Sequence, residues 1–127
     1  MDDFRLLILM FICHVLDDFV LQLACLNKLK QKSWWKSQTD NKLYEHDYYA
    51  GLIVHSFSWA GWTLVPWIFF APTISGGILL ITFLINGILH MIMDNRKANM
   101  MDISLLLDQS FHFSQILITW TILCVVK

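Results

Sequence analysis

The composition of this chain of 127 residues favours a membrane protein. Hydrophobic residues make up 57% of the chain and charged residues only 15%, whereas a soluble domain is about 45–50% apolar and about 25% charged. The mean hydropathy is +0.55. So few charged groups cannot cover the large surface fraction of a small soluble domain. The net charge of −1 also excludes a basic surface for nucleic acid.

The first predicted helix covers residues 4–25 and carries polar residues on one face. Its length suits a membrane span, which requires about 20 largely apolar residues. His14, Asp18 and Gln22 are spaced by four. Residues with this spacing stack along one side of a helix.

The connection after this helix, residues 26–47, is the long polar segment of the chain. It holds five lysines and the pair Trp34 and Trp35, and paired tryptophans suit the headgroup zone of a membrane. Two interpretations remain open. Part of the segment lies along the membrane surface, or the segment is a flexible loop, because it has no sustained apolar stripe.

The next two apolar runs, residues 48–71 and 74–95, predict a helical hairpin, because their connection is short and rich in proline and glycine. His55 lies in the first of them. The second repeats the H-x3-D spacing of the first helix at His90 and Asp94. This repeat indicates two duplicated helical hairpins, related by an axis along the membrane normal.

The last apolar run, residues 103–126, completes the predicted fold and carries Asp108, Gln109 and His112. We therefore expect an all-α polytopic membrane protein, a four-helix transmembrane bundle that forms a single domain over residues 1–127. Asp108 and His112 are again four residues apart and share a helix face.

The distribution of positive charge predicts the orientation. Seven lysine and arginine residues lie in the first and third connections, whereas only Arg5 and Lys127 lie on the other side. Cytoplasmic loops carry an excess of these residues. We therefore expect a multi-pass protein of the inner (plasma) membrane, with both connections cytoplasmic and both termini outside.

The intramembrane histidines and aspartates are predicted to gather in the cytoplasmic half of the bundle. Helices that run in opposite directions bring them to a similar depth, as the rise of about 1.5 Å per residue shows. An ionised group at mid-bilayer costs at least about 2.5–3.5 kcal/mol, so such groups face the interior and mark functional sites. The alternative is a set of interhelical hydrogen bonds that fixes the helix register.

Imidazoles and carboxylates together favour a divalent metal ion, with Zn, Mn or Fe as the best match. On one helix, such a pair supplies two ligands, or one ligand and a carboxylate that orients it. The candidate metal ligands are His14, Asp18, His55, His90, Asp94, Asp108 and His112. The candidate catalytic residues are Asp18, Asp94, Lys97 and Gln22, and Asn86 and Gln109 are further candidates for substrate binding or charge stabilisation.

Three strings of the sequence resemble a known family: HVLDDFVLQ, HMIMDNRK and DQSFH. They are similar to the blocks of the domain-of-unknown-function 3307 family of small bacterial and phage membrane proteins, and the resemblance covers nearly the whole chain. No activity follows from it. The intramembrane His and Asp pairs also resemble, more weakly, those of membrane-bound metal-dependent hydrolases. Asp17 is an extra acid beside the first block, with an accessory hydrogen bond as its expected role.

Three functions are compatible with these features. The first is a metal-dependent hydrolase that acts at the cytoplasmic interface on an amphiphilic or phosphorylated substrate. In it, a bound ion lowers the pKa of water, and the resulting hydroxide attacks a phosphoryl or acyl group of the substrate. The second is a cation or proton transporter or channel. A single chain lacks the polar path through the outer half of the membrane that transport requires, so a homo-oligomer would have to supply this path. The third is a non-catalytic interaction protein whose lysine-rich loop binds anionic lipid or protein.

Overall fold

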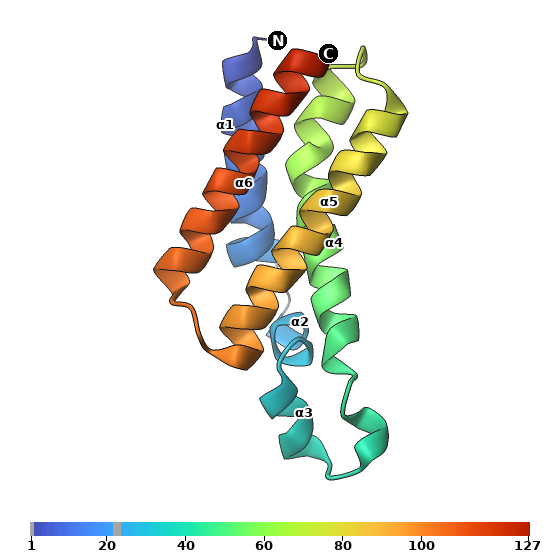
Figure 1. Cartoon of the computed structure of the whole chain (residues 1–127), viewed down its shortest axis with the longest axis vertical. Coiled ribbons are helices and arrows are strands. Elements are labelled where there is room, and N and C mark those ends of the chain that lie inside the picture. The colour runs from blue at the N-terminus through green and yellow to red at the C-terminus, as the bar shows by residue number, and fades with distance from the viewer. Residues whose placement is uncertain (1, 22–23) are drawn as a thin grey trace.

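The computed structural model describes residues 2–21 and 24–127, and every regular element in these ranges is helical. Four helical stretches, α1 with η1, α4, α5 and α6, lie side by side and alternate in direction along the chain (Figure 1). The elements in chain order are α1 (Asp3–Val15), η1 (Leu16–Leu21), α2 (Ala24–Leu29), α3 (Lys32–Gln38), η2 (Lys42–Tyr44), α4 (Tyr48–Phe70), α5 (Gly76–Asn95), η3 (Arg96–Met100) and α6 (Leu105–Val126).

Three helical stretches are long and apolar enough to cross a membrane: Lys42–Phe70, Gly76–Met100 and Leu105–Val126. They correspond to the second, third and fourth predicted spans. The hydroxyls of Ser75 and Ser104 accept hydrogen bonds from the first turns of α5 and α6, which satisfies backbone donors that a helix leaves unpaired. The all-helical class is thus confirmed.

The first helical stretch begins after Asp2, whose carboxylate accepts the amide hydrogen of Arg5, and is described as far as Leu21. The predicted span 4–25 continues over residues 22–23, which lie outside the described residues, to α2, which is helical from Ala24. Leu16–Leu21 form a π-helical turn. Such turns often occur at functional sites, and this one carries Asp17 and Asp18.

The hydrophobic core fills the half of the molecule in which both termini lie (Figure 1). Trp59 and Trp67 of α4 are fully buried there against Leu6 and Met10 of α1. The Trp120 side chain donates a hydrogen bond to the backbone oxygen of Asp3 at 2.7 Å, which ties α6 to α1. We call this half the terminal end and the opposite half, which carries α2 and α3, the loop end.

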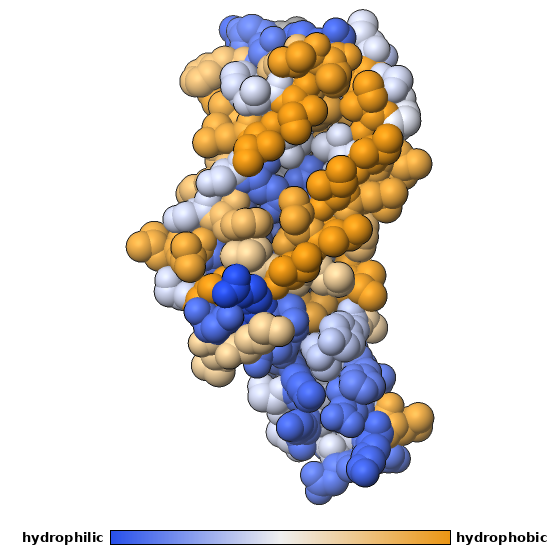
Figure 2. All heavy atoms as spheres, in the orientation of Figure 1, coloured by the Kyte–Doolittle hydropathy of each residue, from blue (hydrophilic) through white to orange (hydrophobic). Residues whose placement is uncertain are grey.

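The outer faces of the long helices expose many large hydrophobic side chains. Figure 2 shows them over α5 and α6, whereas hydrophilic residues cover α2, α3 and η2. Examples are Ile81, Ile85 and Ile88 on α5 and Ile118 and Ile122 on α6, all more than 40% exposed. A surface of this kind and extent indicates contact with lipid or with another protein.

The predicted polar connection folds into short helices, of which α3 projects beyond the ends of α5 and α6 (Figure 1). The Trp35 indole donates a hydrogen bond to the backbone oxygen of Leu29 at 2.8 Å, so α3 is fastened to the end of α2. The backbone at Leu29 and Lys30 packs directly on Gly51 of α4. The segment is therefore docked on the helical core, unlike the flexible loop that was one of the two expectations.

Candidate metal centre

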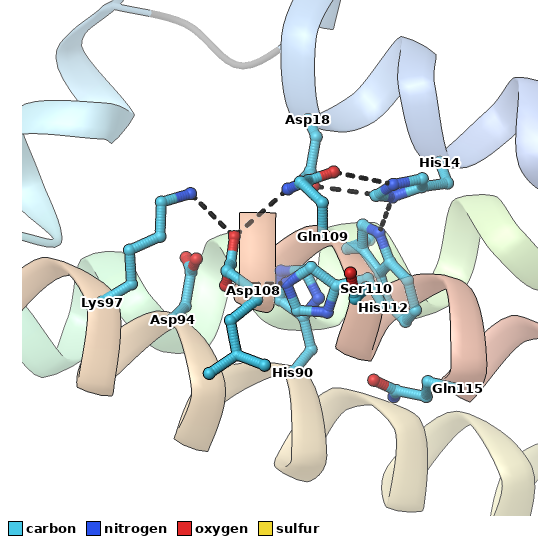
Figure 3. Close-up of polar contacts among 12 residues, drawn as sticks. His14, Asp18, His90, Asp94, Lys97, Asp108, Gln109, Ser110, His112 and Gln115 are labelled. Atoms are coloured by element: carbon cyan, nitrogen blue, oxygen red, sulfur yellow. Dashed lines mark hydrogen bonds and ion pairs between the residues drawn. The ribbon is translucent and has the colours of Figure 1, made fainter. Parts of the chain in front are cut away.

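All seven predicted metal ligands lie together in the interior toward the loop end, and we call them the polar cluster; Figure 3 labels six of them, and His55 contacts three of these six. Six of them are at most 3% exposed, and the Asp18 side chain is 9% exposed. Four helical stretches contribute: α1 with η1 gives His14 and Asp18, α4 gives His55, α5 gives His90 and Asp94, and α6 gives Asp108 and His112.

His55 lies at the centre of the donor atoms. Its Nε2 atom is 3.2 Å from His90 Nε2, 3.4 Å from Asp18 Oδ1 and 3.3 Å from Asp94 Oδ2. Tetrahedral ligands about 2.0–2.1 Å from a Zn²⁺ ion lie about 3.4 Å from one another. These separations therefore match the edges of a metal coordination polyhedron.

Two overlapping groups offer ligand atoms within 4.8 Å of one another. The first is Asp18, His55 and His90, and the second is His90, Asp94 and His112. Both are lined by imidazole nitrogen and carboxylate oxygen, which suit Zn, Mn or Fe. His90 belongs to both groups. The two groups therefore describe neighbouring positions for an ion that share His90 as a ligand.

Two imidazole nitrogens of the cluster lack a hydrogen-bond partner among the described residues. They are Nδ1 of His90 and Nδ1 of His112, whereas His112 Nε2 lies 3.2 Å from Asp108 Oδ1. The His90 ring stacks on His112 with centroids 4.1 Å apart and on Trp59 at 4.4 Å. An unsatisfied buried polar group costs about 1–3 kcal/mol. A bound ion would remove part of that cost, which is why these atoms fit a ligand.

His14 is held differently, because both of its ring nitrogens have partners. The Trp59 indole, which can only donate, gives a hydrogen bond of 2.7 Å to His14 Nδ1. Nε2 must then carry the proton and donate to Gln109 Oε1 at 3.2 Å. His14 Nδ1 lies 3.5 Å from Asp18 Oδ2. His14 is therefore a neutral imidazole that supports the cluster from its edge.

Two lysines form ion pairs with aspartates of the cluster. Lys30, at the junction of α2 and α3, lies 2.7 Å from Asp94 Oδ2. Lys97 of η3 lies 2.8 Å from Asp108 Oδ2, which also accepts a hydrogen bond from Gln109 (Figure 3). Charge-assisted pairs of this length are strong and directional. They hold two of the three cluster carboxylates in place.

The other sequence candidates lie at or outside the cluster. Asn86 lies one turn farther toward the terminal end, where it bonds to Gln115 and Thr119 of α6. Gln22 lies outside the described residues. Asp17 accepts a hydrogen bond from Ser58 at 2.8 Å, which agrees with the accessory role expected for it.

Sequence reasoning missed two contributors. Trp59 is four residues after His55, so the spacing used for the His and Asp pairs would have placed it on the same face. Lys30 carries no such signal, since its partner is 64 residues away in the chain. It is nevertheless only 6% exposed.

Comparison with known proteins gives a family and no activity. The model of the family described as "Protein of unknown function (DUF3307)" matches residues 6–127. No curated protein and no solved structure matches the chain.

Proposed function

Because the chain belongs to the domain-of-unknown-function 3307 family, in a fold with three helices able to span a membrane, we propose that it is a membrane-embedded metal-dependent hydrolase. In this proposal four helices cross the inner membrane and form a bundle. The substrate is an amphiphilic or phosphorylated molecule that reaches the polar cluster from the cytoplasmic face.

The placement in the membrane is supported by surface and charge. The long helices expose hydrophobic side chains along their outer faces. Arg96 and Lys97, together with the lysines of α2, α3 and η2, lie toward the loop end. Because cytoplasmic segments carry an excess of positive charge, this distribution supports a cytoplasmic loop end with both termini outside. The described part of the first helical stretch, Asp3–Leu21, has 13 residues in α1 and 6 in η1, close to the roughly 20 residues that a span needs.

The spacing of donor atoms around His55 is the observation that most strongly supports a metal site. Three donor atoms lie 3.2–3.4 Å from His55 Nε2, and the buried Nδ1 atoms of His90 and His112 have no hydrogen-bond partner among the described residues. Structural packing alone leaves such nitrogens unsatisfied at a cost. A divalent ion bound to a nitrogen of this cluster would satisfy that nitrogen and compensate the nearby carboxylates, so Zn, Mn or Fe fits the donor set.

The chemistry follows from the residues at the edge of the cluster. A divalent ion supplies the activation of water for attack on a phosphoryl or acyl group. Lys97 is partly exposed, with 32% of its side chain accessible, so its ammonium group is placed to bind an anionic group of the substrate. Gln109 bonds both His14 and Asp108, and its amide is placed to stabilise developing negative charge.

Hydrolysis in defined micelles tests the proposal. The purified chain is given lipids that carry phosphate monoester or acyl ester groups, with Zn²⁺ or Mn²⁺. We expect release of phosphate or fatty acid that stops with EDTA, returns with metal, and is lost in Asp18→Asn. Asp102→Asn is the matched control, because Asp102 pairs with Arg96 away from the cluster. The hydrolase proposal would be wrong if turnover persists in EDTA and in Asp18→Asn. It would also be wrong if neither the phosphate monoester nor the acyl ester lipids are hydrolysed.

A second candidate function, cation transport, is favoured by the polar residues beyond the cluster. Asn86, Gln115 and Thr119 form a hydrogen-bonded group within the interface of α5 and α6. It extends the polar interior toward the terminal end, where the sequence shows few ionisable residues. Uptake of divalent ions or protons into liposomes that contain the chain, reduced in Asn86→Leu, would favour transport. Tight liposomes with an intact metal site would exclude it.

A further inference from the structure

Lys30 is buried although it comes from the most polar segment of the chain. It is 6% exposed, and its Nζ atom lies 2.7 Å from Asp94 Oδ2. Lysine is almost never fully buried unless it is paired. The ion pair joins the junction of α2 and α3 to the interior face of α5, in direct contact with a candidate metal ligand.

Packing of the backbone, and not the ion pair alone, fixes the position of Lys30. A Cβ atom at Gly51 would meet the carbonyl carbon of Leu29 at 2.6 Å and the nitrogen of Lys30 at 2.7 Å, so only glycine permits this approach. Asn99 of η3 clamps the same stretch. Its side chain donates to the Lys30 carbonyl oxygen at 3.1 Å and accepts from the Lys32 amide at 2.7 Å.

We propose that Lys30 positions the metal ion: by holding Asp94, it directs the ion to Asp18, His55 and His90. This inference rests on the proposed metal site. The two candidate ligand groups differ in which carboxylate they use, Asp18 in the first and Asp94 in the second. An ammonium group at 2.7 Å competes with a divalent ion for the same carboxylate oxygen and repels it electrostatically.

The charge of the region agrees with this assignment. The carboxylates of Asp17, Asp18, Asp94 and Asp108 are buried or nearly buried, and the ammonium groups of the buried Lys30 and the partly exposed Lys97 pair with two of them. With neutral imidazoles, two negative charges remain among these groups. One divalent ion neutralises them. Asp18 has histidines as near neighbours, with His55 at 3.4 Å and His14 at 3.5 Å.

Titration of the full chain in detergent with Co²⁺, followed by its visible absorption band, tests the inference. Asp18→Asn should weaken binding by at least about tenfold. The double variant Lys30→Met with Asp94→Asn removes a buried pair without leaving an unpaired charge, so it should bind Co²⁺ at least about tenfold more tightly than Asp18→Asn does. Adding Lys30→Met to Asp18→Asn releases Asp94 and should restore most of the lost affinity. Lys30→Arg, which keeps the positive charge, should restore none.

The outcomes separate the inference from the proposed function. Wild type that binds no Co²⁺ would overturn the metal site and the role of Lys30 together. Wild type that binds, with loss of binding in the Lys30→Met and Asp94→Asn double variant, would overturn the role of Lys30 alone. The same holds if Lys30→Met fails to restore binding to a folded Asp18→Asn chain. Melting without metal shows whether the chain with both Lys30→Met and Asp18→Asn folds. If it does not, Co²⁺ binding by the Lys30→Met and Asp94→Asn variant decides whether Lys30 has this role.

Discussion

At the scale of single residues, Asp18 and Asp94 differ although each ends an H-x3-D pair. Asp94 holds the buried ammonium of Lys30 at 2.7 Å, whereas Asp18 lies 3.4 Å from the imidazole of His55. Removal of one partner of a buried ion pair leaves an uncompensated charge. The same substitution at the two positions should therefore have different consequences.

Asp94→Asn should destabilise the metal-free protein, by about 3–5 kcal/mol if Lys30 remains charged. Asp18→Asn should change the stability of the metal-free protein less, because the Asp18 carboxylate contacts the imidazoles of His14 and His55 and the amide of Gln109, groups that an amide also bonds. Melting of both variants in detergent with EDTA measures the difference. Equal melting temperatures would contradict the structural role of the Lys30–Asp94 pair.

The sequence predicted the local part of the site and missed its long-range part. Spacing of four within one helix placed His90 with Asp94 and Asp108 with His112, because helix geometry alone decides which residues share a face. The partner of Asp94 depends instead on how a segment 64 residues away docks. That docking leaves no periodic pattern in the sequence.

At the scale of elements, the long apolar helices were predictable and the internal structure of the polar segment was not. Predicted runs 48–71, 74–95 and 103–126 correspond to α4, α5 and α6, because largely apolar runs define all three and serine caps begin α5 and α6. The first run contains a π-helical turn at Leu16–Leu21. Tertiary contacts of Asp17 and Asp18 with α4 accompany that turn.

Docking of the α2–α3 segment on α4 should depend on Gly51. Gly51→Ala places a Cβ atom 2.6 Å from the Leu29 backbone, so the segment must shift, at a cost of about 1–3 kcal/mol. Gly61→Ala is the matched control on the same helix, since its nearest neighbour would be at 3.8 Å and alanine favours a helix by about 0.5–1 kcal/mol.

Limited proteolysis within α3 and thermal melting report on this docking. We expect faster cleavage and a lower melting temperature for Gly51→Ala, and unchanged cleavage for Gly61→Ala. If both variants behave like wild type, the close approach of the Leu29 backbone to α4 is not what holds the segment.

At the scale of the whole molecule, charge divides the chain into two ends. Lysine and arginine gather at the loop end, and the terminal end carries Arg5 and Lys127. Asp3 contacts Lys127 there, so part of that charge is compensated. Hydrophobic side chains cover the outer faces between the two ends. This pattern is typical of a protein oriented by the positive-inside rule.

A topology reporter fused after Lys127 should show an external C-terminus, because seven positive residues at the loop end favour a cytoplasmic location for that end. A reporter inserted near Asp40, in the connection between α3 and η2, should show the opposite location. A fusion after Lys127 that is active only in the cytoplasm would contradict four membrane crossings with this orientation.

The metal content of the chain, purified from membranes without chelator, shows whether the polar cluster binds a divalent ion. We expect one equivalent of Zn, Mn or Fe in wild type and in Asp102→Asn, and loss of it in Asp18→Asn, because the Asp18 carboxylate both binds the ion and balances its charge. Wild type should also melt at a higher temperature than Asp18→Asn, and chelation should abolish this difference. Wild type without stoichiometric metal, melting like Asp18→Asn in metal-replete buffer, would contradict the account.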